Sequence, residues 1–177
     1  SHEDRFSDVV SNSPENTTLR LADAVNVFET GSLVPGVTIQ NLRYRLISAD
    51  AGLKYRGVFV GAAYFQRWLD DIHADGGLPV TSIVDRGFYL QAAFYPVPHK
   101  LEAYAATSWV FGDTDAGFHR SHEYLGGANW FFAPSTRDIR LNAQLIYVDR
   151  SPVSSVFGYY VGGEKGPIAS FVVSVLF

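Results

Sequence analysis

The chain contains neither cysteine nor methionine. Without cysteine there is no disulfide framework, no thiolate metal site and no cysteine nucleophile. The first residue is Ser1, and no charged segment followed by an apolar one opens the chain. We therefore expect Ser1 to follow a removed leader or to lie within a longer polypeptide.

Long apolar runs are also missing, since no stretch approaches the roughly 20 residues of a membrane-spanning helix. Mean hydropathy is only +0.02. The net charge of -4 gives no reason to expect binding of nucleic acid through bulk charge. Aromatic residues, by contrast, make up 15% of the chain. Many aromatic residues at middling hydropathy are typical of strands that alternate lipid-facing and water-facing positions.

The last ten residues, 168–177 (IASFVVSVLF), alternate with a period of two. Phe171, Val173, Val175 and Phe177 share one side, which predicts a strand with one apolar face. A soluble domain gains little from an apolar last residue, because its terminus frays into solvent. The segment resembles the C-terminal recognition strand of bacterial outer-membrane proteins, in which a final Phe marks the chain for insertion.

Seven segments carry alternating residues, and each is near the roughly 9 to 11 residues that a tilted membrane strand needs. We predict strands at residues 37–47, 52–68, 87–95, 100–111, 122–132, 138–148 and 168–177. Residues 1–36 are polar and broken by Pro14 and Pro35, so we predict an extracellular loop region there. The transmembrane strands then occupy residues 37–177.

The links between these predicted strands alternate in length. Residues 48–51, 96–99 and 133–137 are predicted tight turns, and residues 69–86, 112–121 and 149–167 are predicted longer loops. Outer-membrane barrels have short periplasmic turns and longer external loops. With Phe177 at the periplasmic end, every tight turn is periplasmic and every long loop is external.

One face of each predicted strand is apolar. On residues 52–68 we expect Leu53, Tyr55, Gly57, Phe59, Gly61, Ala63 and Phe65 to face lipid, and on residues 100–111 we expect Leu101, Ala103, Ala105, Thr107, Trp109 and Phe111 to do so. Aromatic residues lie near the strand ends, as girdles at the two membrane interfaces require. The alternative is a soluble sandwich, whose outward faces would carry more charge.

Several stretches carry a resemblance to a known family. They are Asp50-Ala-Gly-Leu-Lys-Tyr-Arg-Gly57, Tyr64-Phe-Gln-Arg-Trp-Leu-Asp-Asp71, Gly87-Phe-Tyr-Leu-Gln91, Gly112 and Gly126-Gly-Ala-Asn-Trp130. Together the chain resembles the C-terminal part of the phosphate-selective porin O/P family. The resemblance implies a sixteen-stranded, homotrimeric barrel in the bacterial outer membrane, with an inward-folded constriction loop in its N-terminal half. This chain would supply about seven C-terminal strands.

A rival count adds an eighth strand at residues 18–28. The chain could then close alone as a small eight-stranded outer-membrane barrel with a structural, adhesion or assembly role. That strand would point Asp23 at lipid in mid-membrane, which costs on the order of a few kcal/mol or somewhat less for an acid. The position of Asp23 on the lipid-facing side therefore argues against this eighth strand.

Five cations are candidates for a pore wall: Arg43, Arg45, Lys54, Arg56 and Arg140. A turn at residues 48–51 would gather the first four at adjacent water-facing positions, with Glu102 as the chief opposing acid. Such a wall raises the local concentration of anions, so we predict an anion-attracting patch. The alternatives are a structural ladder paired with acids outside this chain, or a solvated rim. The resemblance places most selective arginines outside this chain.

We predict no catalytic residue, no metal and no cofactor. His119 and His122 lie across a loop and have no third metal ligand nearby. Ser108 and Ser174 have no histidine at the same height of the predicted barrel wall that could activate them as nucleophiles. The loop acids are interpreted as solvated, or as bridges to lipopolysaccharide through divalent cations; they are Asp70, Asp71, Asp75, Asp113 and Asp115.

The sequence thus predicts a transmembrane antiparallel β-barrel segment from a porin that passes small hydrophilic solutes passively. The expected solutes are small anions such as phosphate. The other expected partners are outer-membrane lipid, lipopolysaccharide and further copies of the chain in a homotrimer.

Overall fold

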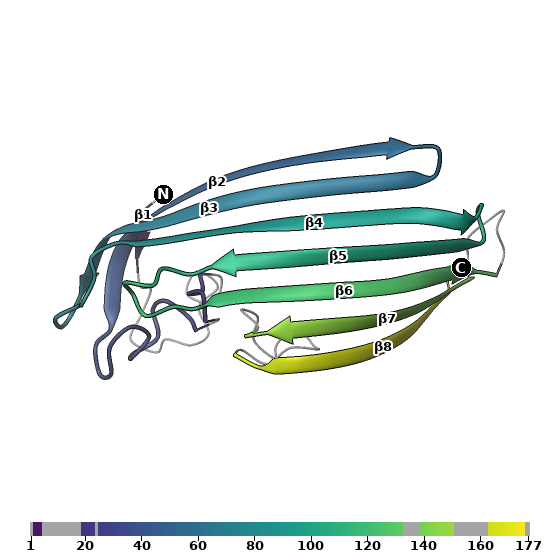
Figure 1. The fold of residues 1–177 in the computed structure, drawn as a ribbon. Helices are drawn as coiled ribbons and strands as arrows, with labels where there is room; N and C mark the ends of the chain where they lie inside the picture. The colour runs from purple at the N-terminus through teal and green to yellow at the C-terminus, as the bar shows by residue number, and fades with distance from the viewer. Residues whose placement is uncertain (1, 5–18, 24, 133–138, 151–162, 176–177) are drawn as a thin grey trace.

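The computed structural model describes residues 2–4, 19–23, 25–132, 139–150 and 163–175, which form an all-β structure without a helix in these ranges. The strands are β1 (His2–Asp4), β2 (Ile39–Tyr55), β3 (Val58–Ala74), β4 (Ile83–Val97), β5 (Leu101–Phe111), β6 (Arg120–Phe131), β7 (Ile139–Asp149) and β8 (Lys165–Val175). They form one antiparallel sheet in sequence order, with the long strands side by side (Figure 1). The prediction of seven long antiparallel strands is confirmed.

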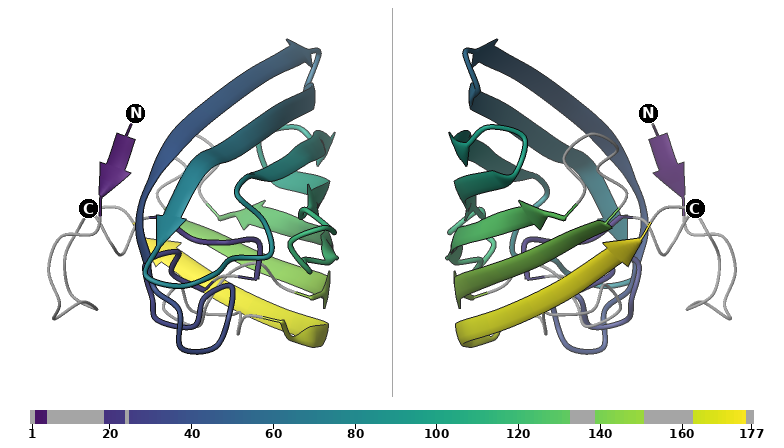
Figure 2. Two further views of the ribbon diagram at one scale, coloured as in Figure 1. Left: turned by 90° about the vertical axis from the view of Figure 1, so that its left-hand side faces the viewer. Right: turned by 90° about the vertical axis from the view of Figure 1, so that its right-hand side faces the viewer.

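The sheet curls across its width into an open trough (Figure 2). Each strand pairs with its neighbours in sequence, and within the described ranges no pairing joins β8 to β1 or β2. A soluble sandwich needs two stacked sheets, whereas the described strands form only one. Among the described strands the sheet is therefore open at its β1 and β8 edges, and the backbone groups of an open edge can pair with a further strand.

Short and longer links alternate along the sheet. Residues 98–100 connect β4 to β5, while residues 75–82 and 112–119 form the longer links after β3 and β5. The short connections lie at one end of the trough and the longer links at the other, which we call the tight-turn end and the long-loop end (Figure 1). The predicted turn at residues 133–137 lies outside the described residues.

The first hairpin turn is not at residues 48–51, so that prediction is wrong. Strand β2 continues to Tyr55, and the chain reverses at Arg56 and Gly57, whose φ angles are 46° and 81°. Two successive left-handed residues form the type I′ turn that matches the twist of a hairpin. Asp50, which suggested a turn, instead pairs with Ala63 within the ladder.

Residues that pair directly across an antiparallel sheet share a face, so the register sorts the side chains into two sets. One row runs Val60, Ala92, Ala105 across three strands. We call its side the outer face. Its exposed large apolar side chains are Ile47, Leu53, Tyr55, Val58, Val60, Tyr64, Val84, Leu90, Phe94, Tyr124, Trp130, Ile139, Leu145, Tyr147, Phe171, Val173 and Val175.

The other set lines the inside of the trough and is called the concave face. Its polar residues are Ser48, Asp50, Lys54, Arg67, Asp85, Tyr89, Gln91, Glu102, Tyr104, Ser108, Ser121, Glu123, Asn129, Arg140, Asn142, Gln144, Ser170 and Ser174. The expected apolar face of residues 100–111 is confirmed as one face. That of residues 52–68 is split, because the turn at Arg56 and Gly57 leaves Leu53 and Tyr55 on the outer face and Phe59 and Phe65 on the concave one.

The described residues of 19–38, which we call the inward segment, lie inside the trough at its long-loop end (Figure 2). The inward segment is not a strand of the sheet, so the alternative eighth strand at residues 18–28 is wrong for its described residues, 19–23 and 25–28. Arg20 and Asn26 form an isolated antiparallel bridge there, and the backbone NH of Leu21 donates to the backbone oxygen of Val25 at 2.8 Å. The apolar side chains of the inward segment complete a buried core with the ends of β2, β3 and β4. The core comprises Leu21, Ala22, Val27, Phe28, Ile39, Leu42, Leu69, Ile72, Ile83 and Phe118.

Candidate functional site

The concave face carries a connected set of polar side chains across β5, β6 and β7. Asn142 Nδ2 donates to Tyr104 Oη at 2.6 Å and to Asn129 Oδ1 at 2.9 Å. Tyr104 Oη donates to Gln144 Oε1 at 3.0 Å, and Asn129 Nδ2 donates to Glu102 Oε2 at 2.8 Å. These hydrogen bonds link the side chains to one another within the wall and so restrict their orientations. We call these five residues the polar network.

Glycine lets Tyr104 lie flat in this wall. Gly127 is the cross-strand partner of Tyr104, and a Cβ built there would come 2.6 Å from Tyr104 Oη. The ring therefore covers the glycine, as aromatic residues do opposite strand glycines. This arrangement keeps the ring out of the open space of the trough.

A cavity of about 360 Å³ lies against the polar network. Phe59, Tyr89, Gln91, Glu102 and Tyr104 are among its lining residues. The lining offers hydroxyl, amide and carboxylate groups beside apolar ring surface. Such a wall can hydrogen-bond water or a passing polar solute, but it offers no nucleophile with an activating base.

An ion pair holds the inward segment to the wall. Arg67 pairs with Asp85, and the exposed fractions of the two side chains are 18% and 4%. Arg67 Nη1 also donates to the backbone oxygen of Arg20 at 2.5 Å, and Asp85 Oδ1 accepts from the backbone NH of Asp113 at 3.1 Å. One pair therefore fixes the segment at residues 19–38 and the link after β5 to adjacent strands. Sequence reasoning missed it, although concave parity on neighbouring strands is a signal that could have found it.

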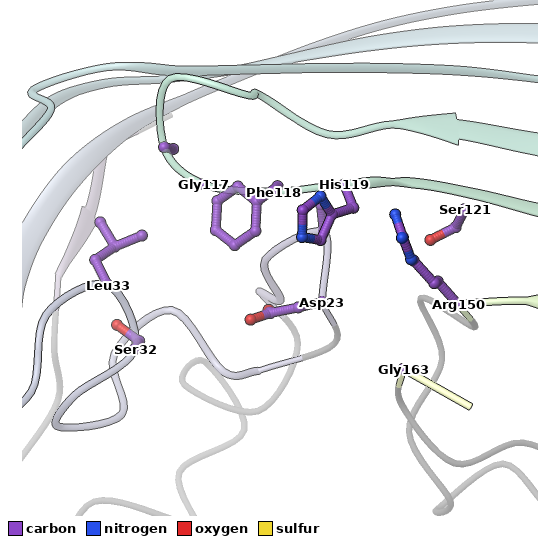
Figure 3. Close-up of a pocket in the computed structure, with 11 residues that line it drawn as sticks. Asp23, Ser32, Leu33, Gly117, Phe118, His119, Ser121, Arg150 and Gly163 are labelled. Atoms are coloured by element: carbon purple, nitrogen blue, oxygen red, sulfur yellow. The ribbon is translucent and has the colours of Figure 1, made fainter. Parts of the chain in front are cut away.

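A second cleft of about 460 Å³ opens beside the inward segment at the long-loop end. Asp23 enters it from that segment, His119 from the link after β5, and Arg150 from the end of β7 (Figure 3). A carboxylate, an imidazole and a guanidinium thus line the same cleft at the long-loop end of the trough. Their mixed charge suits polar solutes without favouring one sign.

The five predicted pore cations do not form one patch. Arg43 and Arg45 lie on the outer face, where they pair with Asp71 at 2.7 Å and with Asp70 at 2.5 Å. Lys54 and Arg140 lie on the concave face, and Arg56 lies in the turn after β2. The predicted gathering of four cations is therefore wrong, because it required the turn at residues 48–51.

The concave face carries both signs of charge. Its bases are Lys54, Arg67 and Arg140, and its acids are Asp50, Asp85, Glu102 and Glu123. Glu102 lies on the concave face and accepts a hydrogen bond from Asn129. Arg140 Nη2 lies 3.3 Å from Ser174 Oγ, to which it donates.

The two histidines of the sequence analysis do not converge. His122 stacks on Trp109 at 4.7 Å on the outer face and lies 3.5 Å from Asp149, whereas His119 lines the cleft at the mouth. In the part of the chain that the structure describes, no three His, Asp or Glu side chains are placed to hold a metal ion.

Comparison with family models, with curated proteins and with solved structures gives no match for this chain. Among the described residues, no helix has the length and apolar character needed to cross a membrane.

Proposed function

We propose that this chain is a C-terminal wall of an outer-membrane porin, with its outer face against lipid and its concave face against a water-filled channel. The channel passes small hydrophilic solutes by passive diffusion. The resemblance to the phosphate-selective porin O/P family supports a sixteen-stranded homotrimer in the bacterial outer membrane. The open sheet edges at β1 and β8 suit a wall continued by other strands.

The distribution of exposed apolar side chains carries this proposal. On the outer face the exposed fractions of Leu53, Leu145 and Phe171 are 70%, 68% and 76%. Keeping such a side chain out of water is worth about 1.5–3 kcal/mol, and contiguous apolar surface of this kind marks a contact with lipid or another protein. The opposite side of the same strands carries amides, hydroxyls and charges. This inside-out arrangement suits a sheet with acyl chains outside and water inside.

Strand length and aromatic placement agree with that orientation. The seven long strands have 11 to 17 residues each, and a tilted strand needs about 9–11 to cross the hydrocarbon core. Outer-face aromatic residues gather at two levels, with Phe88 and Trp109 toward the long-loop end and Phe94 and Trp130 toward the tight-turn end. Aromatic residues at both levels are typical of the two interfaces of a membrane.

Anion preference in this proposal rests on Lys54 and Arg140. They are the two predicted cations that the register places on the concave face, and neither has an ion pair within the described residues. Each of these cations raises the anion concentration in its own vicinity, while Asp50, Glu102 and Glu123 place acids elsewhere on the same face. Arg43 and Arg45 contribute little to selectivity, since they face outward and are paired.

The membrane orientation is tested by adjacent alanines on opposite faces. Ala62 is on the outer face and Ala63 on the concave face of β3. Because the chain has no native cysteine, Ala62→Cys and Ala63→Cys each give one reporter. In native membranes, a water-soluble thiol reagent is expected to label Ala63→Cys, whereas a bilayer-embedded quencher reaches a fluorophore at Ala62→Cys. Equal water accessibility at both positions would refute the proposed orientation.

Channel activity is tested on the full-length protein in planar bilayers. We expect stepwise conductance, with a reversal potential in a salt gradient that favours anions. Lys54→Ala with Arg140→Ala is expected to weaken the anion preference, and the matched pair Arg43→Ala with Arg45→Ala to leave it unchanged. No conductance from folded, inserted protein would reject the porin proposal, and an equal effect of both pairs would reject the assignment of the selective cations.

A further inference from the structure

The outer face carries a compact band of stacked rings near the long-loop end, formed by Phe88, Trp109, Phe111, His122 and Tyr124. Phe88 stacks on Trp109 with ring centroids 5.9 Å apart, and Trp109 lies 6.1 Å from Phe111 and 4.7 Å from His122. Tyr124 meets Trp109 edge to face at 5.9 Å. We call these five residues the aromatic belt.

Two arginines flank this belt on the side away from the apolar middle of the sheet. Phe111 on β5 pairs directly with Arg86 on β4 and with Arg120 on β6, so all three side chains share the outer face. Both arginines are exposed. The Arg120 guanidinium lies 5.6 Å from the centre of the Phe111 ring, which draws it toward Arg86.

These two arginines differ from the other arginines of the same face. Arg43 and Arg45 have carboxylate partners in Asp71 and Asp70. Neither Arg86 nor Arg120 has an ion pair within the described ranges. The outer face thus presents two uncompensated positive charges beside an aromatic surface.

The spacing of the two cations suits one anionic group. Strands two apart in a sheet are separated by about 10 Å, a gap that two extended arginine side chains converging from either side can close around a phosphate. Guanidinium groups bind phosphate oxygens in a planar, bidentate way that a lysine cannot reproduce. The aromatic belt then lies where the acyl chains of the same molecule would run.

We propose that Arg86 and Arg120 form a clamp for a phosphate of lipopolysaccharide, with Phe111 between them. The inference rests on the proposed porin orientation, which places the long-loop end at the outer leaflet, where lipopolysaccharide is the phosphorylated lipid. It assigns this lipid to uncompensated arginines rather than to the loop acids.

The test measures lipid retention by native mass spectrometry of the full-length protein in detergent. The probes are bisphosphorylated lipid A, dephosphorylated lipid A, phosphatidylglycerol and inorganic phosphate. Arg86→Gln with Arg120→Gln is expected to weaken binding of bisphosphorylated lipid A by about tenfold or more. The matched pair Arg43→Gln with Arg45→Gln removes the same charge from the same face, and we expect less than about a twofold change because those arginines are already paired. Arg86→Lys with Arg120→Lys should bind with intermediate affinity.

Three results would overturn the clamp: equal loss in both glutamine pairs, equal retention of lipid A with and without phosphates, or equally tight, arginine-dependent binding of phosphatidylglycerol or inorganic phosphate. Heat-modifiable migration on gels checks that each variant is folded. Channel conductance separates the two proposals. A conducting wild-type protein without arginine-dependent lipid A binding refutes the clamp alone, whereas a folded protein that neither inserts nor conducts refutes the porin.

Discussion

Neighbouring residues of each strand point to opposite faces of the sheet, and the side chains on the two faces differ in polarity. On β5 the outer face carries Ala105, Thr107 and Trp109, while the concave face carries Glu102 and Tyr104 of the polar network. Large apolar side chains are exposed on the outer face, yet Asp85 and Asn129 are buried on the concave one. A water-soluble sheet has the reverse pattern. The difference indicates that the surroundings of each face, rather than strand propensity, selected its residues.

The two faces also differ in how they are stabilised. The concave face is held by hydrogen bonds, one buried ion pair and a small apolar core at the long-loop end. Within the described ranges the outer face has aromatic contacts at its long-loop end but no protein layer covering its apolar middle. Substitutions on the two faces should therefore lower the stability of the protein for different reasons.

The largest effect is expected where the concave face holds charges away from water. Asp85→Ala leaves the Arg67 guanidinium largely buried without its carboxylate, so we expect a loss of about 3–5 kcal/mol in the free energy of unfolding. Tryptophan fluorescence during urea unfolding in lipid vesicles measures it. Asp50→Ala, on the same face but exposed, is the matched control, with an expected change within about 0.5 kcal/mol.

A double variant decides whether the loss comes from an unpaired charge. Arg67→Met with Asp85→Leu replaces the pair by apolar side chains of similar size, which is often neutral in proteins. We expect it to recover most of the stability of the wild-type protein. If the double variant is as unstable as Asp85→Ala, the pair acts by fixing the inward segment rather than by neutralising charge.

The next effect contrasts the two faces directly at adjacent alanines. Ala105 is an outer-face residue in the middle of β5, and Ala106 lines the trough. If the outer face contacts lipid, as proposed, Ala105→Arg is expected to cost about 2–4 kcal/mol in the free energy of unfolding, the depth-dependent penalty for a cation that faces hydrocarbon. Ala106→Arg should cost less than about 1 kcal/mol and should lower conductance instead. Unfolding in vesicles and planar-bilayer recordings measure the two outcomes, and equal costs at both positions would remove the distinction between the faces.

Most of the strand pattern was predictable from sequence, because alternation and turn residues are local signals. The strand at residues 100–111 was predicted within one residue of β5, and its apolar face matches the register. The first hairpin was not predicted correctly, because Asp50 and Gly52 suggested a turn as strongly as Arg56 and Gly57 did. Because β2 continues through residues 48–51 without a turn, Arg43, Arg45 and Lys54 lie on one strand. Side-chain direction reverses with each residue, so Arg43 and Arg45 lie on the opposite face from Lys54.

The position of the inward segment and its contact with Arg67 could not be predicted from local patterns. Contact between Arg67 and the backbone of Arg20 joins residues far apart in sequence, and residues 19–38 were predicted as external loop apart from their last two positions. The polar network also joins residues far apart in sequence, since Tyr104 and Asn142 come together only through the register of three strands. Spacing within one strand carries no information about such contacts.

The smallest expected effect removes one hydroxyl from each face. Tyr104 bonds Asn142 and Gln144 in the polar network, so Tyr104→Phe should cost about 0.5–1.5 kcal/mol, the net value of a lost hydrogen bond. Tyr124→Phe is the matched change on the outer face, where the ring contacts of Tyr124 with Trp109 and His122 persist without the hydroxyl. We expect almost no change in its urea midpoint. Because Asn142 keeps Asn129 as an acceptor, a loss well above this range at Tyr104 would mean that the network acts as a unit. Equal losses at both tyrosines would mean that the hydroxyl of Tyr104 in the polar network contributes no more to stability than the hydroxyl of Tyr124 on the outer face.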